Sequence, residues 1–578
     1  MRLKVTKSKN SASLYVIKSI YNSKTQSNTS KIVEKLGTEA ELLEKLNGED
    51  PYVWAKNYIN ELNKKEKLEN KEVLVKYLPN KQISKDEQRS FNGGYLFLQK
   101  IYNELGLNKI TKDISSRYKF NYNLDSILSR LVYSRIIFPA SKLATNELSK
   151  NFIEQPDFDL HQIYRALEVI SKESDFIQSE LYNNSLKVYN RKKGILYYDC
   201  TNYFFEIEQE DGLKQYGVSK EHRPNPIVQM GLFMDADGIP LAFCINKGNT
   251  NEQVTLKPLE EKIISDFKLS KFVVCTDAGL ASTANRKFND AKNRSFITTQ
   301  SVKKLKKHLK EWALDTNGWK LSGSNTIFNI NELDEEKDFQ KVFHKERWIK
   351  EDGLEQKLIV TFSLKYKNYQ ETIRNRQVEK AQNTIDKNPT KLKKCNANDY
   401  KRFITKSSCT DDGEIASNNI LGIDMSLVSK EAAYDGFYAV CTNLSDDASS
   451  IIKVNQKRWE IEECFRIMKT EFKARPIFLQ NDDRIEAHFT TCFISLMIYR
   501  LLEKKLEEKF TCSETITTLK NMNFLEVHGE GYIPTYTRTD LTDSLHDIFG
   551  FRTDFQIVNN QTMKKIFKST KSEKSTQK

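Results

Sequence analysis

The stretch GILYYDCTNYFFE, residues 194–206, is an apolar run that places one acid, Asp199, among strand-forming residues. β-Branched and aromatic side chains are enriched in strands, so the run predicts a strand. A carboxylate is almost never buried unless it is paired or bound to a metal. Asp199 therefore needs a partner, and a helix-capping role explains it poorly because strand-like sequence continues on both sides.

A second acid, Asp277, ends a shorter run of the same kind, KFVVCTDAG at residues 271–279. This run predicts a short buried strand that stops at the acid and a glycine. Two interpretations of Asp277 stay open at this point. It is either a second buried ligand or the cap of a helix that residues 281–285, ASTAN, could begin.

The elements between and around these runs follow a simple order. Residues 227–234 and 239–245 predict a hairpin, and the turn residues Asp235 and Asp237 are interpreted as turn formers rather than as ligands. Helical patterning and short apolar runs then alternate. The predicted order is three antiparallel strands up to residue 245, a helix over 251–267, the Asp277 strand, a helix over 282–292 and a strand over 295–299.

The third acid, Glu462, lies in the stretch NQKRWEIEECFRIMK, residues 455–469. At about 3.6 residues per turn, a helix here sorts its side chains onto two unlike faces. One stripe is apolar and its neighbour is charged: the first comprises Ile461, Phe465, Met468 and Phe472, and the second Arg458, Glu462, Arg466 and Lys469. Taken alone, Glu462 is typical of a solvated surface ion pair.

The three acids together point to metal chemistry. Hard cations such as Mg²⁺ and Mn²⁺ bind oxygen ligands, and two such ions can activate a hydroxyl and stabilise the leaving oxygen in phosphodiester chemistry. Two Asp on adjacent strands and one Glu on a facing helix can form such a site. We therefore interpret Asp199, Asp277 and Glu462 as candidate catalytic residues and metal ligands.

At these residues the chain resembles a DDE transposase of the insertion-sequence-four type. That family carries a Tyr-x-x-Arg-x-x-x-Glu-(six residues)-Lys signature around its catalytic Glu. Arg458, Glu462 and Lys469 fall in register with it, and the Tyr position holds Asn455. Further resemblances occur in the same order over roughly residues 190 to 500, namely at 198–206, 219–224, 276–279 and 458–462.

The resemblance implies a fold, a reaction and partners. The catalytic domain would have the RNase H-like fold, with two Mg²⁺ ions, or Mn²⁺ in their place, held by Asp199, Asp277 and Glu462. The reaction would be cleavage of double-stranded DNA at the terminal inverted repeats of a transposon and strand transfer into target DNA, by a homodimer in a synaptic complex. The residues expected to bind DNA are Arg458, Lys469, Arg466 and Asn455.

The fold class expected is mixed α/β, with the RNase H-like domain interrupted by an insertion. The separation of Glu462 from Asp277 is too long for an uninterrupted fold of this kind, and Trp312, Trp319 and Trp348 fall within the inserted residues. Each Trp has two interpretations, a core side chain or a stacking platform for a base. The expected parts are 1–85, a hairpin and helix module; 86–190, a helical domain; 191–300, the first part of the core; 301–434, a partly β insertion; 435–500, the second part of the core; and 501–578, a C-terminal helical region with a disordered basic tail from residue 564.

Charge, cysteine content and apolar runs indicate the general class of protein. The 578 residues carry 91 Lys and Arg against 78 Asp and Glu, a net charge of +13, which is compatible with a polyanionic partner. The nine Cys lie singly, without zinc-ligand spacing, as in reduced cytosolic proteins. The most apolar later run, residues 489–502, is too short to span a bilayer. We expect a soluble bacterial protein of the cytoplasm without membrane attachment.

Two alternatives remain at this stage. A host nuclease on the same fold would cut DNA without joining it, and an inactive or domesticated relative would bind DNA without cutting. The presence of all three acids argues against an inactive relative, whereas Asn455 keeps that hypothesis open. An ATP-driven motor is disfavoured because the sequence contains no G-x-x-x-x-G-K-[ST] loop.

Overall fold

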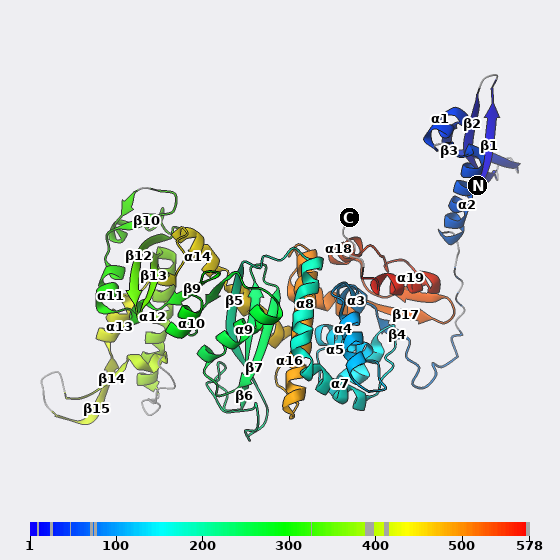
Figure 1. Cartoon of the computed structure of the whole chain (residues 1–578). Coiled ribbons are helices and arrows are strands. Elements are labelled where there is room, and N and C mark those ends of the chain that lie inside the picture. The colour runs from blue at the N-terminus through cyan, green and yellow to red at the C-terminus, as the bar shows by residue number, and fades with distance from the viewer. Residues whose placement is uncertain are drawn as a thin grey trace. The chain divides into compact units, whose positions relative to one another are not determined.

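The chain divides into two compact units, Met1–Glu87 and Gln88–Lys578, in a computed structural model (Figure 1). The structure describes residues 1–573 apart from 9–10, 23–26, 47, 70–72, 74, 76–77, 325, 388–397 and 410–414. The fold is mixed α/β, as expected from the sequence.

The first unit is a small sheet with two helices. Strands β1 (Arg2–Lys7), β2 (Ala12–Asn22) and β3 (Ser27–Thr38) are antiparallel, and α1 (Glu39–Lys45) and α2 (Pro51–Glu69) follow. Leu14, Leu42 and Ala55 form its core. The β2–β3 hairpin confirms the hairpin expected within residues 1–85, and residues 23–26, between the two strands, lie outside the described residues.

The second unit begins with a helical part built around one buried helix. Helix α16 (Asp482–Lys505) packs against the earlier helices α3, α5 and α7. The elements before the main sheet are β4 (Ser90–Asn92), α3 (Tyr95–Glu104), α4 (Leu107–Arg117), α5 (Leu124–Ile137), α6 (Lys142–Leu148), α7 (Leu160–Lys172) and α8 (Ser174–Val188). Helix α16 is buried on nearly all sides because the helical part surrounds it. It is long and apolar enough to cross a membrane, yet 94% of its most apolar window is buried in the protein.

One large mixed sheet carries the centre of the second unit. Within the described residues its strand order is β11-β10-β12-β13-β16-β9-β8-β5-β6-β7. Strand β5 pairs in parallel with β8 and antiparallel with β6, which is the neighbour relation the sequence predicts. The elements of this part are β5 (Ile195–Phe204), β6 (Ile227–Asp235), β7 (Pro240–Lys247), α9 (Leu256–Asp266), β8 (Phe272–Thr276), α10 (Thr283–Phe288) and β9 (Arg294–Gln300).

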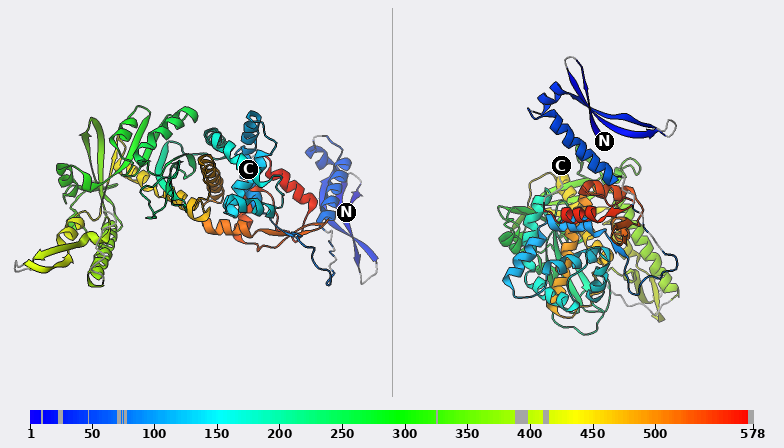
Figure 2. Two further views of the ribbon diagram at one scale, coloured as in Figure 1. Left: turned by 90° about the horizontal axis from the view of Figure 1, so that it is seen from below. Right: turned by 90° about the vertical axis from the view of Figure 1, so that its right-hand side faces the viewer.

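The inserted residues extend this same sheet. Strand β13 pairs with β16, so the inserted strands join the core by backbone hydrogen bonds (Figures 1 and 2). Trp319 is fully buried, Trp312 packs against the same core, and Trp348 is 48% exposed. The elements are α11 (Lys307–Leu314), β10 (Trp319–Leu321), β11 (Ile327–Phe328), β12 (Phe343–Glu351), β13 (Leu354–Phe362), α12 (Leu364–Lys387), β14 (Ile404–Cys409), β15 (Ile415–Ile423), α13 (Met425–Ala432) and β16 (Phe437–Thr442).

The predicted single helix over residues 455–469 is wrong in its continuity. The chain forms α14 (Ala448–Gln456), a turn at 457–458, α15 (Trp459–Arg466) and a π-helical turn over Ile467–Glu471. The apolar stripe is confirmed, because Ile461, Phe465, Met468 and Phe472 are all buried. A π-helical turn contains more residues per turn than an α-helix, so Lys469 leaves the line that Arg458 and Glu462 define.

The C-terminal residues contain strands as well as helices. Helix α17 (Cys512–Asn521) precedes β17 (Asn523–Val527), β18 (Gly531–Pro534), α18 (Asp540–Phe549), β19 (Val558–Asn559) and α19 (Asn560–Thr570), and β17 also pairs with β4. The prediction of disorder from residue 564 is wrong as far as Thr570, because Met563 and Ile566 bury α19 against the core. Residues 574–578 lie outside the described part. Short 3-10 helices occur at Ser149–Asn151, Glu252–Val254, Val302–Lys304, Ile330–Glu332 and Tyr400–Phe403.

Candidate active site

Asp199 and Asp277 lie at the same level of two neighbouring strands. The pairing of β5 with β8 aligns Ile195 with Val273, Leu196 with Val274 and Tyr197 with Cys275. Asp199 and Asp277 each lie two residues beyond the last of these pairs. If the same register continues, Asp199 lies opposite Asp277, which directly follows β8. The parallel pairing therefore brings together two acids that are far apart in the sequence.

Asp199 faces the helices that follow β16. Alternate side chains of a strand point to the same face, so Tyr197, Asp199 and Thr201 share one. The Tyr197 hydroxyl donates a 2.9 Å hydrogen bond to the carbonyl of Val454, and the Thr201 hydroxyl accepts a 2.7 Å hydrogen bond from Lys469 Nζ. Because Asp199 lies between these two contacts, the chain from Val454 to Lys469, which includes α15, crosses over it.

Glu462 is the carboxylate that α15 brings to this crossing. The burial of Ile461 and Phe465 fixes the helix against the core and leaves Glu462 exposed. Glu462 lines an open cavity of about 540 Å³ together with Arg458 and Trp459. In the part of the chain that the structure describes, Glu462 makes no hydrogen bond or ion pair. Its carboxylate is therefore available to a cation, although the carboxylates of Asp199, Asp277 and Glu462 do not all lie within 4.8 Å of one another.

Arg458 and Asn455 are linked to the sheet by a chain of hydroxyl groups. Arg458 Nη1 donates to the hydroxyl of Thr299 over 3.3 Å, and that hydroxyl lies 2.7 Å from the hydroxyl of Tyr438. The side-chain amide of the buried Asn455 donates to the same Tyr438 oxygen over 2.7 Å. Cys275, on β8 two residues before Asp277, approaches the Asn455 amide oxygen at 3.6 Å. Asn455 is thus a buried anchor between α14, β8 and β16 rather than an exposed polar group.

Lys469 lies on the other side of Asp199. Its ammonium group contacts Thr201 and, at 3.4 Å, the carboxylate of Glu221. Burial, together with the nearby charge of Lys220, lowers the pKa of Lys469 to about 8. Lys220 in turn donates to the carbonyl of Cys200 and pairs with Glu252 at 3.1 Å. Two cations therefore flank Asp199, and only Lys469 was identified from the sequence.

Arg466 is not brought to the acids. Its guanidinium group pairs with Glu463 at 2.5 Å and with Glu471 at 3.5 Å, and the residue is exposed. The structure thus separates Arg466 from the other predicted site residues.

The electrostatics of the acids fit a bound cation. Burial raises the pKa of Asp199 to about 6, and the negative charge of Asp277 adds to the rise, whereas Lys220 opposes it. A divalent cation would remove the repulsion between the two carboxylates, and with Glu462 the donor set consists of hard oxygens of the kind that Mg²⁺ and Mn²⁺ prefer. The residues present therefore fit such a metal.

A model of the family described as transposase DDE domain matches residues 203–498, just over half of the 578-residue chain. The chain belongs to this transposase family. The match covers β6 to β9, the inserted strands, α15 and most of α16. Asp199 lies just before its first residue, on the strand that the matched region continues.

Other comparisons of this transposase are distant or empty. One solved structure, a cryo-EM structure of a piggyBac transposase synaptic complex with hairpin DNA, is similar with a TM-score of 0.36 and 7% identity, over 84% of this chain and 88% of that one. No curated protein matches the chain. The family assignment therefore rests on the family model alone.

The sequence did not identify three residues that contact the candidate site. Tyr438, Thr299 and Lys220 come from β16, β9 and the segment between β5 and β6, and only the tertiary fold brings them to Asn455, Arg458 and Asp199. Of the three, only Lys220 could have been identified from the sequence, because it falls within residues 219–224, a segment that resembles the family.

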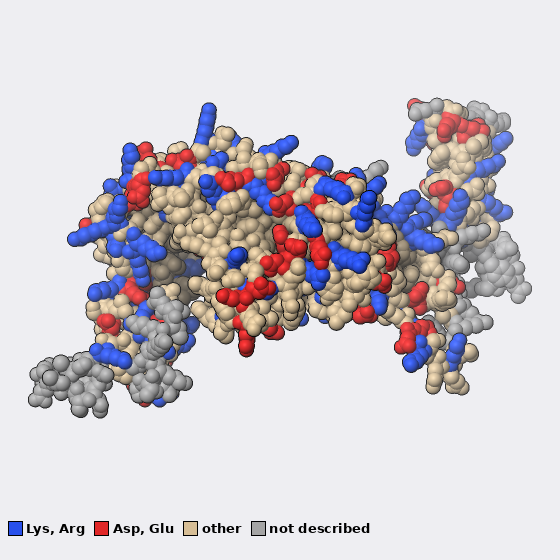
Figure 3. Space-filling view, turned by 60° about the horizontal axis from the view of Figure 1, so that its bottom comes forward, with Lys and Arg blue, Asp and Glu red and all other residues tan. Residues whose placement is uncertain are grey.

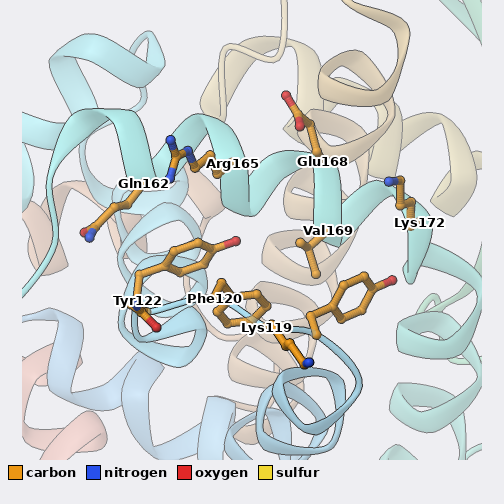
Figure 4. Close-up of a pocket in the computed structure, with 10 residues that line it drawn as sticks. Lys119, Phe120, Tyr122, Gln162, Arg165, Glu168, Val169 and Lys172 are labelled. Atoms are coloured by element: carbon orange, nitrogen blue, oxygen red, sulfur yellow. The ribbon is translucent and has the colours of Figure 1, made fainter.

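A second pocket of the transposase lies in its helical part and does not suit metal chemistry. Figure 4 shows Phe120 and Tyr122, from the loop between α4 and α5, facing the side chains of α7. Glu168 is the one carboxylate among the lining residues, all of which the structure describes, and it pairs with Arg484 at 2.8 Å. One paired carboxylate cannot replace the three-acid site.

Proposed function

We propose that the protein is a cut-and-paste DNA transposase of the insertion-sequence-four type. It would cleave double-stranded DNA at the terminal inverted repeats of its element and join the freed 3′-hydroxyl to target DNA. The observation that carries the proposal is the alignment of Asp199 with Asp277 on parallel strands beneath the helix that bears Glu462. This is an arrangement of three carboxylates suited to phosphodiester chemistry.

The three acids have one shared role in this proposal, which is to hold the metal. Asp199, Asp277 and Glu462 would hold two Mg²⁺ ions, which Mn²⁺ can replace, and when bound these ions would stabilise charge on the phosphodiester oxygens and activate the attacking hydroxyl. Asp199 is fixed by the hydrogen bond that the amide of Cys200 donates to it over 2.8 Å, and Asp277 by the amide of Leu280 over 3.0 Å. These bonds fix the direction of both carboxylates before a cation arrives.

The cations would bind DNA phosphates. Arg458 and Lys469 lie on opposite sides of the acids, where each can contact a phosphate next to the scissile bond without reading its base. Arg466 can bind DNA only away from the acids and only by leaving Glu463 and Glu471. On the face shown in Figure 3, basic and acidic side chains are interspersed, so phosphate binding is expected at local sites rather than over one uniform basic surface.

Asn455 would act through Tyr438. The family signature has Tyr where this chain has Asn455, and the hydroxyl of Tyr438 reaches the Asn455 amide from the neighbouring strand. Tyr438 would thereby position Thr299 and, through it, the guanidinium of Arg458. In the full reaction we place two copies of the chain in a synaptic complex, in the cytoplasm of a bacterium.

A combined cleavage and joining assay tests the proposal. The substrate is a duplex carrying the DNA that flanks the gene, incubated with Mg²⁺ or Mn²⁺ and a circular target. A transposase nicks the end and joins it to the target, and Glu462→Gln binds the duplex without nicking it. Cleavage without joining would favour the host nuclease, and binding without cleavage in both metals would favour the inactive relative.

A further inference from the structure

A third, smaller pocket lies at the junction of the helical part with the segment that follows the π-helical turn. Its volume is about 220 Å³. The segment 473–479, which includes Lys473 and Arg475, lines one side, and the end of α5 with the start of α6, which includes Arg135 and Lys142, lines the other. His488 of α16 also lines it.

Three of the residues that line this pocket are buried basic side chains among mainly apolar neighbours. Arg135 and Lys142 are each only 4% exposed, and His488 is 6% exposed. Arg135 donates to two backbone carbonyls, those of Phe472 and Ala140, each at 3.1 Å. The ammonium group of Lys142 is buried and has no hydrogen-bond partner among the described residues. His488 faces the carbonyl of Ala474 at 3.1 Å.

The pocket lacks a counter-charge of its own. None of its lining residues, all of them described, is an Asp or a Glu. The nearby carboxylate of Glu221 is shared by Arg475 and Lys469. Buried charges are costly unless they are paired, so an anion from outside the chain would compensate Arg135 and the protonated form of Lys142.

The pocket is connected to the candidate active site through one short segment. Lys469 and Arg475 bind the same Glu221 carboxylate, and Ile477 pairs with Phe205, which directly follows β5. Asp199 and Phe205 are six residues apart on an extended chain, which corresponds to roughly 20 Å at about 3.3 Å per residue. One strand of duplex DNA covers that length in about six nucleotides.

We propose that this pocket binds a backbone phosphate of the DNA, several nucleotides from the bond that the three acids cleave. The inference rests on the proposed transposase function for the identity of the ligand and on the pocket itself for its chemistry. Arg135 and Lys142 line the pocket from α5 and α6, and Lys473 and Arg475 line it from the segment that also leads to Lys469. A phosphate contact at this distance positions the duplex and carries no base specificity.

The state of Lys142 supports an anion site. Burial lowers the pKa of Lys142 to about 7, and the charge of Arg135 lowers it further, against a small opposing effect of Cys492. Burial likewise lowers the pKa of Arg135 and holds that of His488 well below its ordinary value. A bound phosphate would favour the protonated form of Lys142, so binding near neutral pH should take up protons.

The test uses inorganic phosphate as the probe and the full-length protein. Thermal unfolding is followed at pH 7 as a few millimolar phosphate replaces chloride at constant ionic strength. We expect the unfolding temperature of wild type to rise and saturate, and the rise to be lost in Lys142→Met and reduced in Lys473→Met. Lys345→Met is the matched control, because Lys345 is a buried lysine of the insertion that binds the Asp315 carbonyl at 2.6 Å. It should respond to phosphate as wild type does.

A second measurement, made with duplex DNA, shows whether the pocket binds a phosphate of DNA or only free inorganic phosphate. The binding constant of the duplex, Kobs, is measured at several salt concentrations. In a plot of log Kobs against the logarithm of the salt concentration, the magnitude of the slope should be smaller by about one for Lys142→Met than for Lys345→Met. No phosphate response in wild type, or an equal response in Lys142→Met, would overturn the pocket. Loss of the phosphate response with an unchanged salt slope would overturn the DNA ligand. Neither readout requires cleavage, so failure of the transposase proposal is detected separately.

Discussion

The environment of Asp199 differs from that of an ordinary surface acid. It is half-buried, it lies opposite a second acid, and Lys220 and Lys469 flank it. Such an environment destabilises the charged carboxylate until a cation or a proton compensates it. A metal ion bound at Asp199 would supply that compensation.

Replacing Asp199 by Asn should stabilise the metal-free protein at neutral pH. The pKa of Asp199 is about 6 in the folded protein against an ordinary value of 3.8, so wild-type stability falls as pH rises through this window and stays low above it. Asp199→Asn lacks this loss and should be more stable by about 2–3 kcal/mol at pH 7, with the difference disappearing near pH 4. The free energies of unfolding of wild type and Asp199→Asn are compared in the presence of a chelator at several pH values. Equal values for the two proteins at pH 7 would contradict the destabilising effect of the Asp199 charge.

Removing the hydroxyl of Tyr438 should slow DNA cleavage more than it weakens the fold. Tyr438→Phe loses the bonds to Asn455 and Thr299 and leaves Arg458 less well positioned. We expect cleavage to fall about tenfold or more, duplex affinity to stay unchanged, and stability to fall by about 1–2 kcal/mol.

Tyr536→Phe is the matched control for this change, because it removes a 2.8 Å hydroxyl bond to Thr553 in the C-terminal region. Full cleavage by Tyr438→Phe would show that Arg458 needs no support from this strand.

At the scale of elements, α15 is supported from behind by the β6–β7 turn. The carbonyl of Gly238 accepts hydrogen bonds from Arg500 Nε at 2.9 Å and from Cys464 of α15 at 3.7 Å. Arg500 also binds Glu460 of α15 at 3.1 Å. The turn, α16 and α15 are thus joined at one point, which fixes the helix that carries Glu462.

A methyl group at Gly238 should therefore disturb the site at a distance. Gly238 has φ +73°, and its added Cβ would lie about 2.0 Å from a Glu460 oxygen and 2.2 Å from an Arg500 nitrogen. Gly238→Ala should lower stability by about 2–5 kcal/mol and should reduce cleavage.

Gly353→Ala separates the clash from backbone strain. Gly353 has a similar φ of +77° but no atom closer than 3.9 Å to the added carbon. It should lose about 1–2 kcal/mol and keep its cleavage activity. Equal effects of the two variants, compared by chemical unfolding and nicking, would contradict the supporting role of the turn.

The elements show what the sequence could and could not predict. The strands bearing Asp199 and Asp277 were predictable, because apolar runs with β-forming residues mark buried strands. That the two strands are neighbours followed from the RNase H-like fold that the family resemblance implies. The break at residues 457–458 and the π-helical turn were not, because helical periodicity continues through both. Tyr438 and Lys142 were not either, because their roles arise from contacts between distant segments.

At the scale of the whole molecule, the two units have separate cores. Leu14, Leu42 and Ala55 pack within the first unit, and the other apolar clusters belong to the second. The inserted strands extend the central sheet of the second unit, so they should unfold together with β5 and β8.

A chain that begins at Gln88 should therefore fold without the first unit. Its unfolding temperature should match the main transition of the full-length protein within a few degrees, because none of its apolar clusters loses a member. Calorimetry of the two proteins checks this, and an unfolded or aggregated product would contradict the independence of the units.

Binding of Mn²⁺ tests the central claim most directly, because it depends on the three acids and on no DNA sequence. Electron paramagnetic resonance titration compares wild type with Asp199→Asn, Asp277→Asn and Glu462→Gln, and with Glu463→Gln as control, since Glu463 pairs with Arg466 on the same helix. We expect each of the three variants to weaken Mn²⁺ binding about tenfold or more and the control to bind as wild type does. Unchanged binding in any one of the three would remove that acid from the site, and equal weakening in the control would contradict the site altogether.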